Sequence, residues 1–115
     1  MSPTIAFDPS GRPRFVLGSP GGNDIINYVA LALVGLIDWG LDAQQAADLP
    51  HYGSRNRATE IEQGTAVEAL APALRARGHD VRVAPEASGL HIIGIGPMGL
   101  EGGADPRREG VALGD

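Results

Sequence analysis

The sequence predicts an α+β fold, in which short helices pack against an antiparallel or mixed sheet. Three observations lead to this prediction. A hairpin pattern opens the chain at residues 4–17, a strongly apolar helical segment follows at residues 25–39, and apolar strand segments return at residues 80–83 and 90–95. No internal repeat or domain linker interrupts the chain, so we expect residues 1–115 to form a single unit.

The N-terminal segment has the pattern of a β-hairpin. Two strand-like stretches, residues 4–7 and 14–17, flank the turn sequence Asp-Pro-Ser-Gly at residues 8–11. Pro13 stands at the start of the second stretch, where the missing N–H of proline is tolerated. The hairpin is therefore expected to begin the sheet.

The helix predicted at residues 25–39 is apolar on nearly every side. Asn23 or Asp24 is expected to cap its start, and Gly40 is expected to end it. A helix of this kind needs cover on more than one face, which a short chain supplies poorly. We therefore expect the chain to be part of a larger layered protein or to pack against another subunit.

Two shorter helices are predicted from capping sequences. Asp42, with Gln45 three residues later, predicts one short helix. Residues 65–68, Thr-Ala-Val-Glu, form a second capping box, for a helix that Gly78 should end. Pro72 either kinks this helix or marks its first turn.

The remaining segments are expected to be extended. Residues 51–63 are polar, and Glu60 and Glu62 should share a solvated face at the edge of the sheet. The strand at residues 90–95 is apolar on both faces, which predicts a central position in the sheet. After it, a turn at residues 97–100 is expected to lead into a tail that contains glycine and arginine.

Composition excludes several classes of function. The chain has 14 acidic residues against nine arginines and no lysine, so neither nucleic acid nor an anionic membrane is an expected partner. The absence of cysteine excludes disulfides, thiolate metal sites and a cysteine nucleophile. The apolar stretch at residues 25–41 is interrupted by Asn27 and Asp38 and is short for a membrane span. No signal peptide is recognisable, which leaves the compartment open.

The imidazoles give no sign of a metal site. His51, His79 and His91 show no spacing typical of metal ligands, so we expect neither a metal nor another cofactor. His79 is expected to cap the carbonyls of the preceding helix, and His91 to be a strand residue with a hydrogen-bond partner. Residues 105–108, Asp-Pro-Arg-Arg, form either a surface turn or an ion-paired corner, and we favour the solvated turn.

The strongest local feature is the sequence Gly-Ser-Pro-Gly-Gly at residues 18–22, between a strand and a helix. Two consecutive glycines let the backbone approach a ligand closely and direct successive N–H groups at one place. That place also lies at the positive end of the helix dipole. Such a place stabilises a phosphate or a developing oxyanion. The same residues also fit an ordinary strand-to-helix turn, and they lack the spacing of a P-loop or a dinucleotide fingerprint.

Six segments, in order along essentially the whole chain, resemble the γ-glutamyltranspeptidase family. They are residues 1–5 (MSPTI), 18–22 (GSPGG), 36–41 (LIDWGL), 46–50 (AADLP), 74–79 (LRARGH) and 102–108 (GGADPRR). The resemblance implies part of the αββα sandwich of N-terminal-nucleophile hydrolases, with this chain as the C-terminal part of the small subunit.

The resemblance also implies a reaction. In this family a precursor cleaves itself, and the new N-terminal threonine is both nucleophile and base. A γ-glutamyl group then moves from glutathione or a related amide, through an acyl-enzyme, to water or an amino acid. By resemblance, Gly21 and Gly22 supply oxyanion-hole N–H groups, and Ser19 is a candidate substrate-binding residue.

Departures from the family pattern limit what this chain does by itself. The catalytic threonine and the residues that hold the glutamyl α-amino group would lie upstream of Met1, so we expect the chain alone to be inactive. The serine pair that binds the α-carboxylate would immediately precede Met1. Thr4 matches the threonine just after that pair and is not the nucleophile. Asn23-Asp24 replace a Ser-Arg or similar pair of many members, which points to a changed acceptor preference.

The resemblance names the partners as well. They are the large subunit and the N-terminal part of the small subunit, together with a γ-glutamyl small molecule as substrate. Bacterial members are often periplasmic or secreted. Two alternatives stay open: a catalytically silent assembly or binding module that self-associates through the helix at residues 25–39, and an anion-binding protein that uses residues 18–22.

Overall fold

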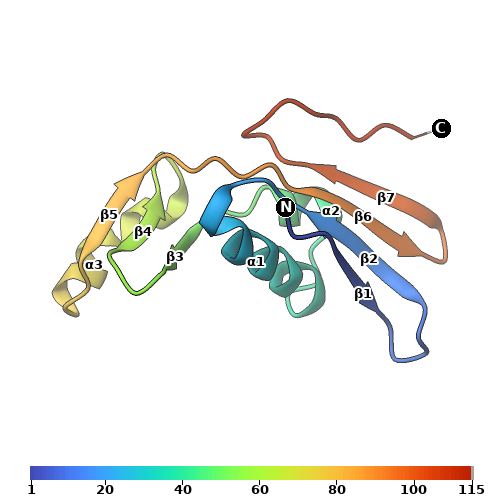
Figure 1. The fold of residues 1–115 in the computed structure, drawn as a ribbon, viewed down its shortest axis with the longest axis horizontal. Coiled ribbons are helices and arrows are strands. Elements are labelled where there is room, and N and C mark those ends of the chain that lie inside the picture. The colour runs from blue at the N-terminus through green and yellow to red at the C-terminus, as the bar shows by residue number, and fades with distance from the viewer. Residues whose placement is uncertain (115) are drawn as a thin grey trace. The chain divides into compact units, whose positions relative to one another are not determined.

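The computed structural model describes residues 1–114. These fall into two compact units, the first made of residues 1–49 and 87–114 and the second of Pro50–Glu86 (Figure 1). The second unit is inserted into the first along the chain. The single unit expected for residues 1–115 remains a prediction.

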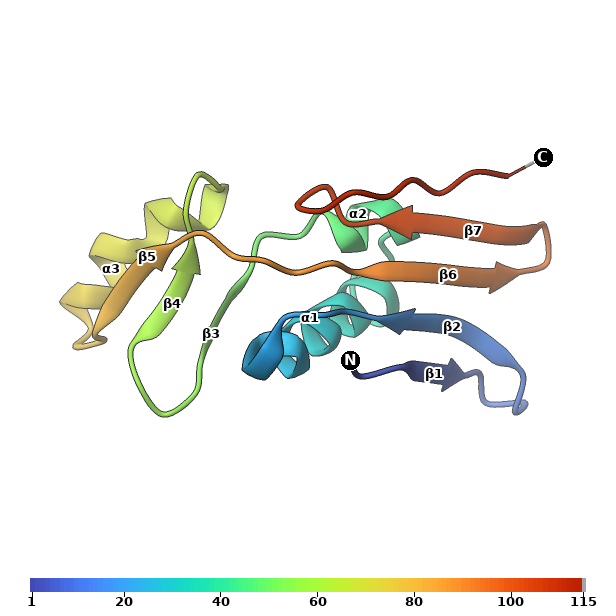
Figure 2. The ribbon, with the colours of Figure 1, turned by 45° about the horizontal axis from the view of Figure 1, so that its top comes forward.

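The first unit is built on a four-stranded antiparallel sheet in the order β1-β2-β6-β7 (Figure 2). Its strands are β1 (Thr4–Phe7), β2 (Pro13–Gly18), β6 (His91–Gly96) and β7 (Gly99–Ala104). The predicted hairpin and the interior position of the strand at residues 90–95 are confirmed. Strand β7 lies where the sequence predicted a tail, because its residues GLEGGA include no β-branched side chain to signal a strand.

Two helices pack on one face of this sheet. Helix α1 (Ile25–Ile37) follows a 3₁₀ turn, η1 (Gly22–Asp24), and ends two residues before the predicted Trp39. Asp24 occupies the N-cap position of α1, but its side chain makes no capping hydrogen bond. Helix α2 (Ala43–Ala47) has the predicted capping box of Asp42 and Gln45.

The core of the first unit lies between the sheet and the two helices. Cross-strand neighbours Leu17 and Ile92 supply the sheet side, and the helices supply Val29, Ala32, Leu36, Ala43, Ala46 and Ala47. The small side chains of α2 bring its backbone close to the sheet. At Gly103 of β7 an added Cβ would collide with the backbone of Ala43, so this approach requires glycine.

The second unit is a three-stranded mixed sheet with one helical connection. The strands are β3 (Tyr52–Ser54), β4 (Thr59–Glu62) and β5 (Val81–Ala84), in the order β3-β4-β5. Strands β3 and β4 are antiparallel, whereas β4 and β5 are parallel and joined through η2 (Ala66–Leu70) and α3 (Ala71–Ala76). Ile61, Ala71 and Val81 form its core.

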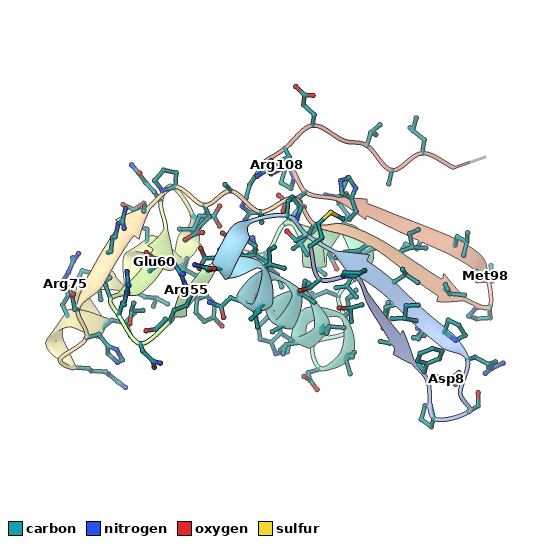
Figure 3. All side chains as sticks on the ribbon, viewed as in Figure 1. Asp8, Arg55, Glu60, Arg75, Met98 and Arg108 are labelled. Atoms are coloured by element: carbon teal, nitrogen blue, oxygen red, sulfur yellow. The ribbon has the colours of Figure 1, made fainter. Side chains whose placement is uncertain are left out.

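The predicted solvated edge at Glu60 and Glu62 is wrong. Strand β4 is the middle strand of its sheet, and Glu62 is only 6% exposed. Its Oε2 accepts the backbone N–H of His51 over 2.8 Å, which satisfies the buried carboxylate. Glu60 is half-buried and pairs with Arg55 and Arg82, and Figure 3 labels Glu60 and Arg55.

The predicted capping box at residues 65–68 does not form. The hydroxyl of Thr65 donates to the carbonyl oxygen of Glu62, and Glu68 accepts the N–H of Gly64. These bonds pull the segment into a 3₁₀ turn, and α3 starts only at Ala71. Pro72 therefore lies in the first turn of α3, which confirms the second of its two interpretations.

The end of α3 forms as predicted at Gly78, which has φ = +92°. His79 caps the helix through its backbone, since its N–H donates to the carbonyl oxygen of Leu74 over 3.1 Å. Its ring lies elsewhere, with Nδ1 3.4 Å from the hydroxyl of Thr59. No helix among residues 1–114 has the length and apolar character needed to cross a membrane.

Candidate functional site

The glycine loop, residues 19–22, connects the end of β2 to η1 and α1. Gly21 has φ = +137° and Gly22 has φ = +61°, a region that side chains disfavour and glycine adopts freely. A Cβ on Gly21 would also lie 2.6 Å from Cε2 of Tyr28. Backbone conformation and space thus both require glycine at residue 21.

The backbone N–H groups of Gly21 and Gly22 stand at the amino end of the η1–α1 segment. The first N–H groups of a helical segment have no partner within it, and the helix dipole adds partial positive charge there. Two adjacent donors of this kind suit an oxygen that carries or develops negative charge.

Ser19, the first residue of the glycine loop, is fully buried. Its hydroxyl donates to the carbonyl oxygen of Pro20 over 2.7 Å and accepts the N–H of Gly89 over 3.0 Å. The side chain thereby ties the loop to the residues that lead into β6. Its assignment as a substrate-binding residue remains a prediction.

A second cluster, the C-terminal corner, is formed by residues 105–108. The carboxylate of Asp105 accepts the hydroxyl of Ser88, the N–H of Leu90, and both the N–H and the guanidinium of Arg107. Asp105 is 2% exposed, so the favoured solvated turn is wrong and the ion-paired corner is correct. Burial alone raises the pKa of Asp105, but these hydrogen bonds outweigh it and hold the pKa below 3.8.

Next to the glycine loop lies an open pocket of about 520 Å³. It is bounded by the N-terminal residues, strands β2, β6 and β7, and residues 111–113. Ser19, Pro20 and His91 contribute to its wall, which is otherwise largely apolar. Gly21 and Gly22 are not part of this wall.

The three histidines are not brought together. His51 is buried in the second unit, His79 lies beside Thr59, and His91 is an exposed residue of β6. Within the described part of the chain, no group of three or more potential ligands could hold a metal ion.

The N-terminal residues run beside the glycine loop. Strand β1 pairs with β2 so that Thr4 lies opposite Leu17, and the Cβ direction of Gly18 points to Pro3, 3.6 Å from its Cα. The hydroxyl of Thr4 donates to the carbonyl oxygen of Ser2 over 3.1 Å. Thr4 is therefore an internal strand residue.

Ser88 and Gly89 were not predicted as functional residues from the sequence. Gly89 has no room for a side chain, because a Cβ there would lie 2.7 Å from Cδ of Arg108 and 2.8 Å from Cγ of Pro20. The only available signal was the Ser-Gly pair just before an apolar strand. Such a pair is also common in loops, so the signal is weak.

Comparison with known structures defines the class of protein. A crystal structure of acivicin-inhibited gamma-glutamyltranspeptidase matches with a TM-score of 0.85 and 27% identity, covering 95% of this chain and 61% of that chain. The fold is part of the αββα sandwich of N-terminal-nucleophile hydrolases, as the resemblance implied.

A sequence profile described as Gamma-glutamyltranspeptidase matches residues 1–115, and the chain belongs to this family. The Acylase ACY 1 proenzyme of Pseudomonas sp. (strain SE83) is 38% identical over 98% of this chain. The Glutathione hydrolase proenzyme of Escherichia coli (strain K12) is 36% identical over 93% of it. The chain spans only 20% and 19% of the lengths of these two relatives.

Proposed function

We propose that this chain supplies the oxyanion hole of a γ-glutamyltransferase-like enzyme. The enzyme would transfer a γ-glutamyl group from a glutathione-type donor to water or an amino acid. The observation that carries the proposal is the pair of positive-φ glycines, Gly21 and Gly22, at the amino end of the η1–α1 segment. Relatives that bear the names glutathione hydrolase and acylase support acyl transfer as the reaction class.

The role of the two N–H groups follows from the chemistry of acyl transfer. When a nucleophile attacks the γ-carbonyl carbon, the carbonyl oxygen becomes an oxyanion, and donors already in place stabilise it. One such donor contributes about 3–4 kcal/mol to the transition state. The nucleophile would come from the remainder of the enzyme, so the chain by itself would not turn over substrate.

The N-terminal residues support a complete site at this place. Strand β1 pairs with β2 up to Thr4 opposite Leu17, and Pro3 lies beside Gly18. Met1 then lines the same pocket as Ser19 and Pro20. The serine pair that the resemblance implies just before Met1 would therefore lie near the glycine loop, where a γ-glutamyl donor could contact both.

The remainder of the enzyme would cover the open face of the four-stranded sheet. Side chains alternate across a strand, so Ile5, Val16 and Ile93, which are cross-strand neighbours, face away from the helices. Ile5 is 54% and Ile93 45% exposed. In an αββα sandwich a second sheet packs on this face, and it would bury these side chains.

The reading frame upstream of Met1 gives the first test, since the proposal requires a threonine nucleophile and the serine pair there. The encoded enzyme should release the anilide from a γ-glutamyl anilide, whereas residues 1–115 alone should not. Gly21→Ala, whose added methyl group collides with Tyr28 and displaces the neighbouring N–H groups, should then lower kcat at least tenfold with little change in KM.

Gly64→Ala is the matched control, because Gly64 also has positive φ (+78°), but has open space around it and lies in the second unit. Turnover by residues 1–115 alone, or equal kcat values for the two variants, would contradict the proposal.

An acylase with a different acyl group is the second candidate, favoured by the 38% identity to Acylase ACY 1 proenzyme. The same N–H pair serves any acyl transfer, so the loop does not separate the two. Offering the enzyme a γ-glutamyl anilide and an anilide of a longer dicarboxylic acid would separate them. Turnover of neither would favour the silent assembly module.

A further inference from the structure

The segment Ala87–Leu90 lies between the glycine loop and the C-terminal corner. These two features are far apart in sequence, and neither direct ion pairs nor strand pairing joins them. The contacts that residues 87–90 make on each side connect the glycine loop to the C-terminal corner.

On the loop side, the link is a buried serine. Gly89 donates its N–H to the hydroxyl oxygen of Ser19, and that hydroxyl donates to the carbonyl oxygen of Pro20. Ser19 is fully buried, so water does not compete for either bond. The position of Gly89 therefore fixes the peptide that immediately precedes Gly21.

On the corner side, one carboxylate holds both neighbours of Gly89. Asp105 accepts the hydroxyl of Ser88 over 2.5 Å and the N–H of Leu90 over 3.0 Å. Its own N–H donates to the carbonyl oxygen of Leu90 over 2.8 Å. The guanidinium of Arg108, labelled in Figure 3, donates to the carbonyl oxygens of Ala87 and Ser88.

Gly89 also packs directly between the C-terminal corner and the glycine loop. The hydrogen of Gly89 that a Cβ would replace points between Cδ of Arg108 and Cγ of Pro20, at 2.7 and 2.8 Å from the Cβ position. Nothing larger than glycine fits between the corner and the loop. A shift of the corner is thus passed to Pro20 by contact as well as by hydrogen bonds.

We propose that Asp105 is a positioning residue for the oxyanion hole, acting through Ser88, Leu90 and the Gly89–Ser19 bond on the N–H groups of Gly21 and Gly22. It touches no reacting atom. The inference rests on the proposed function, which assigns the glycine loop as the oxyanion hole. The coupling between the C-terminal corner and the glycine loop can be measured without enzyme turnover.

The test is backbone ¹⁵N relaxation of residues 1–115. In the unaltered chain, Gly21 and Gly22 should have order parameters near those of rigid backbone, about 0.85. Ser88→Ala, which removes one bond to Asp105, and Gly89→Ala, which forces the two sides apart, should lower both values below about 0.6. Ala32 and Leu36 in the core should keep theirs.

Gly94→Ala is the matched control. Gly94 lies in β6, a few residues from Gly89, and a Cβ there would make only ordinary contacts, the nearest at 3.6 Å. This variant should leave Gly21 and Gly22 rigid. If Gly89→Ala fails to fold, the milder Ser88→Ala decides.

Unchanged order parameters at Gly21 and Gly22 in Ser88→Ala, or an equal loss in Gly94→Ala, would overturn the inference. A mobile loop in the unaltered chain would do so too. An enzyme without γ-glutamyl activity would refute the proposed function alone, since the relaxation result does not depend on it.

Discussion

Arg107 and Asp105 form a buried ion pair, with Nη1 of the arginine 3.0 Å from Oδ1 of the aspartate and side-chain exposures of 13% and 1%. The same guanidinium donates to the carbonyl oxygens of Ala47, the last residue of α2, and Leu49, two residues beyond it. The C-terminal corner thereby holds both the end of α2 and the segment that leads into β6. Both charged groups of the pair also hydrogen-bond to other residues, which is the condition under which burial of charge is tolerated.

Arg107→Ala should therefore be strongly destabilising. It leaves the Asp105 carboxylate buried without its cation and removes the donors to Ala47 and Leu49, so we expect a loss of about 3–5 kcal/mol in the free energy of unfolding. Urea denaturation of residues 1–115 measures it. Arg12→Ala is the control, because Arg12 is 81% exposed and its pair with Asp8 is solvated. Similar losses for the two variants would contradict the assigned role of the corner.

Stability should fall in acid, and part of the fall should belong to Asp105. Its folded-state pKa is below 3.8, so the unfolded chain binds more protons and stability is lost as pH drops through this range. In Asp105→Asn the unfolding free energy should vary less with pH below about 4 than in the unaltered chain.

Asp8 provides an internal comparison for this titration. The hydroxyl of Ser10 and the N–H of Arg12 lower the pKa of Asp8 to about 2. Carboxyl ¹³C shifts followed from pH 6 downward should show midpoints below 3.8 for both residues. A midpoint for Asp105 above 3.8 would mean that burial outweighs its hydrogen bonds.

Local patterns were enough to predict much of the fold. The hairpin, α1, the capping box of α2 and the central β6 each have a short-range signature in turn residues, apolar runs or caps. Strand β7 has none, and its Gly103 is required by the close approach of α2, a long-range contact. The capping box near residue 65 failed for a different reason: the side chains of Thr65 and Glu68 bond to the backbone of Glu62 and Gly64 instead of to each other's backbone N–H groups.

The candidate site also contains residues that the local sequence signals and residues whose role depends on long-range contacts. Gly21 and Gly22 could be singled out because consecutive glycines before a helix are visible in sequence, and both have positive φ in the structure. Their oxyanion-hole role remains a prediction. The corner was misjudged because Asp-Pro-Arg-Arg has the composition of a surface turn. Only the position of Ser88 and Leu90, contributed from elsewhere in the chain, converts Asp105 into a buried acceptor.

Glu62 and Glu60 should respond differently to the same change. They lie on one face of β4, but Glu62 is buried with its carboxylate on the N–H of His51, whereas Glu60 pairs with partly exposed arginines. Glu62→Ala leaves a buried donor to find another partner, so we expect a loss of about 1–3 kcal/mol. Glu60→Ala should cost below about 1 kcal/mol. Urea denaturation measures both, and an equal cost would restore the solvated edge that the sequence suggested.

Gly21 and Gly22 should differ in their tolerance of alanine. Both have positive φ, but a Cβ on Gly22 meets nothing within 4 Å, while one on Gly21 lies 2.6 Å from Cε2 and 3.1 Å from Cδ2 of Tyr28. Gly22→Ala should therefore cost only the backbone penalty, about 1–2 kcal/mol. Gly21→Ala should cost about 1–3 kcal/mol more, because the buried ring has to move.

A double-mutant cycle isolates the contact with the ring. In a Tyr28→Leu background the aromatic edge is gone, so Gly21→Ala should lose most of its extra cost, while Gly22→Ala should cost the same as before. Urea denaturation of the single and double variants gives the coupling. Equal costs for Gly21→Ala in the two backgrounds would mean that backbone conformation alone, and not the space beside Tyr28, requires glycine at residue 21.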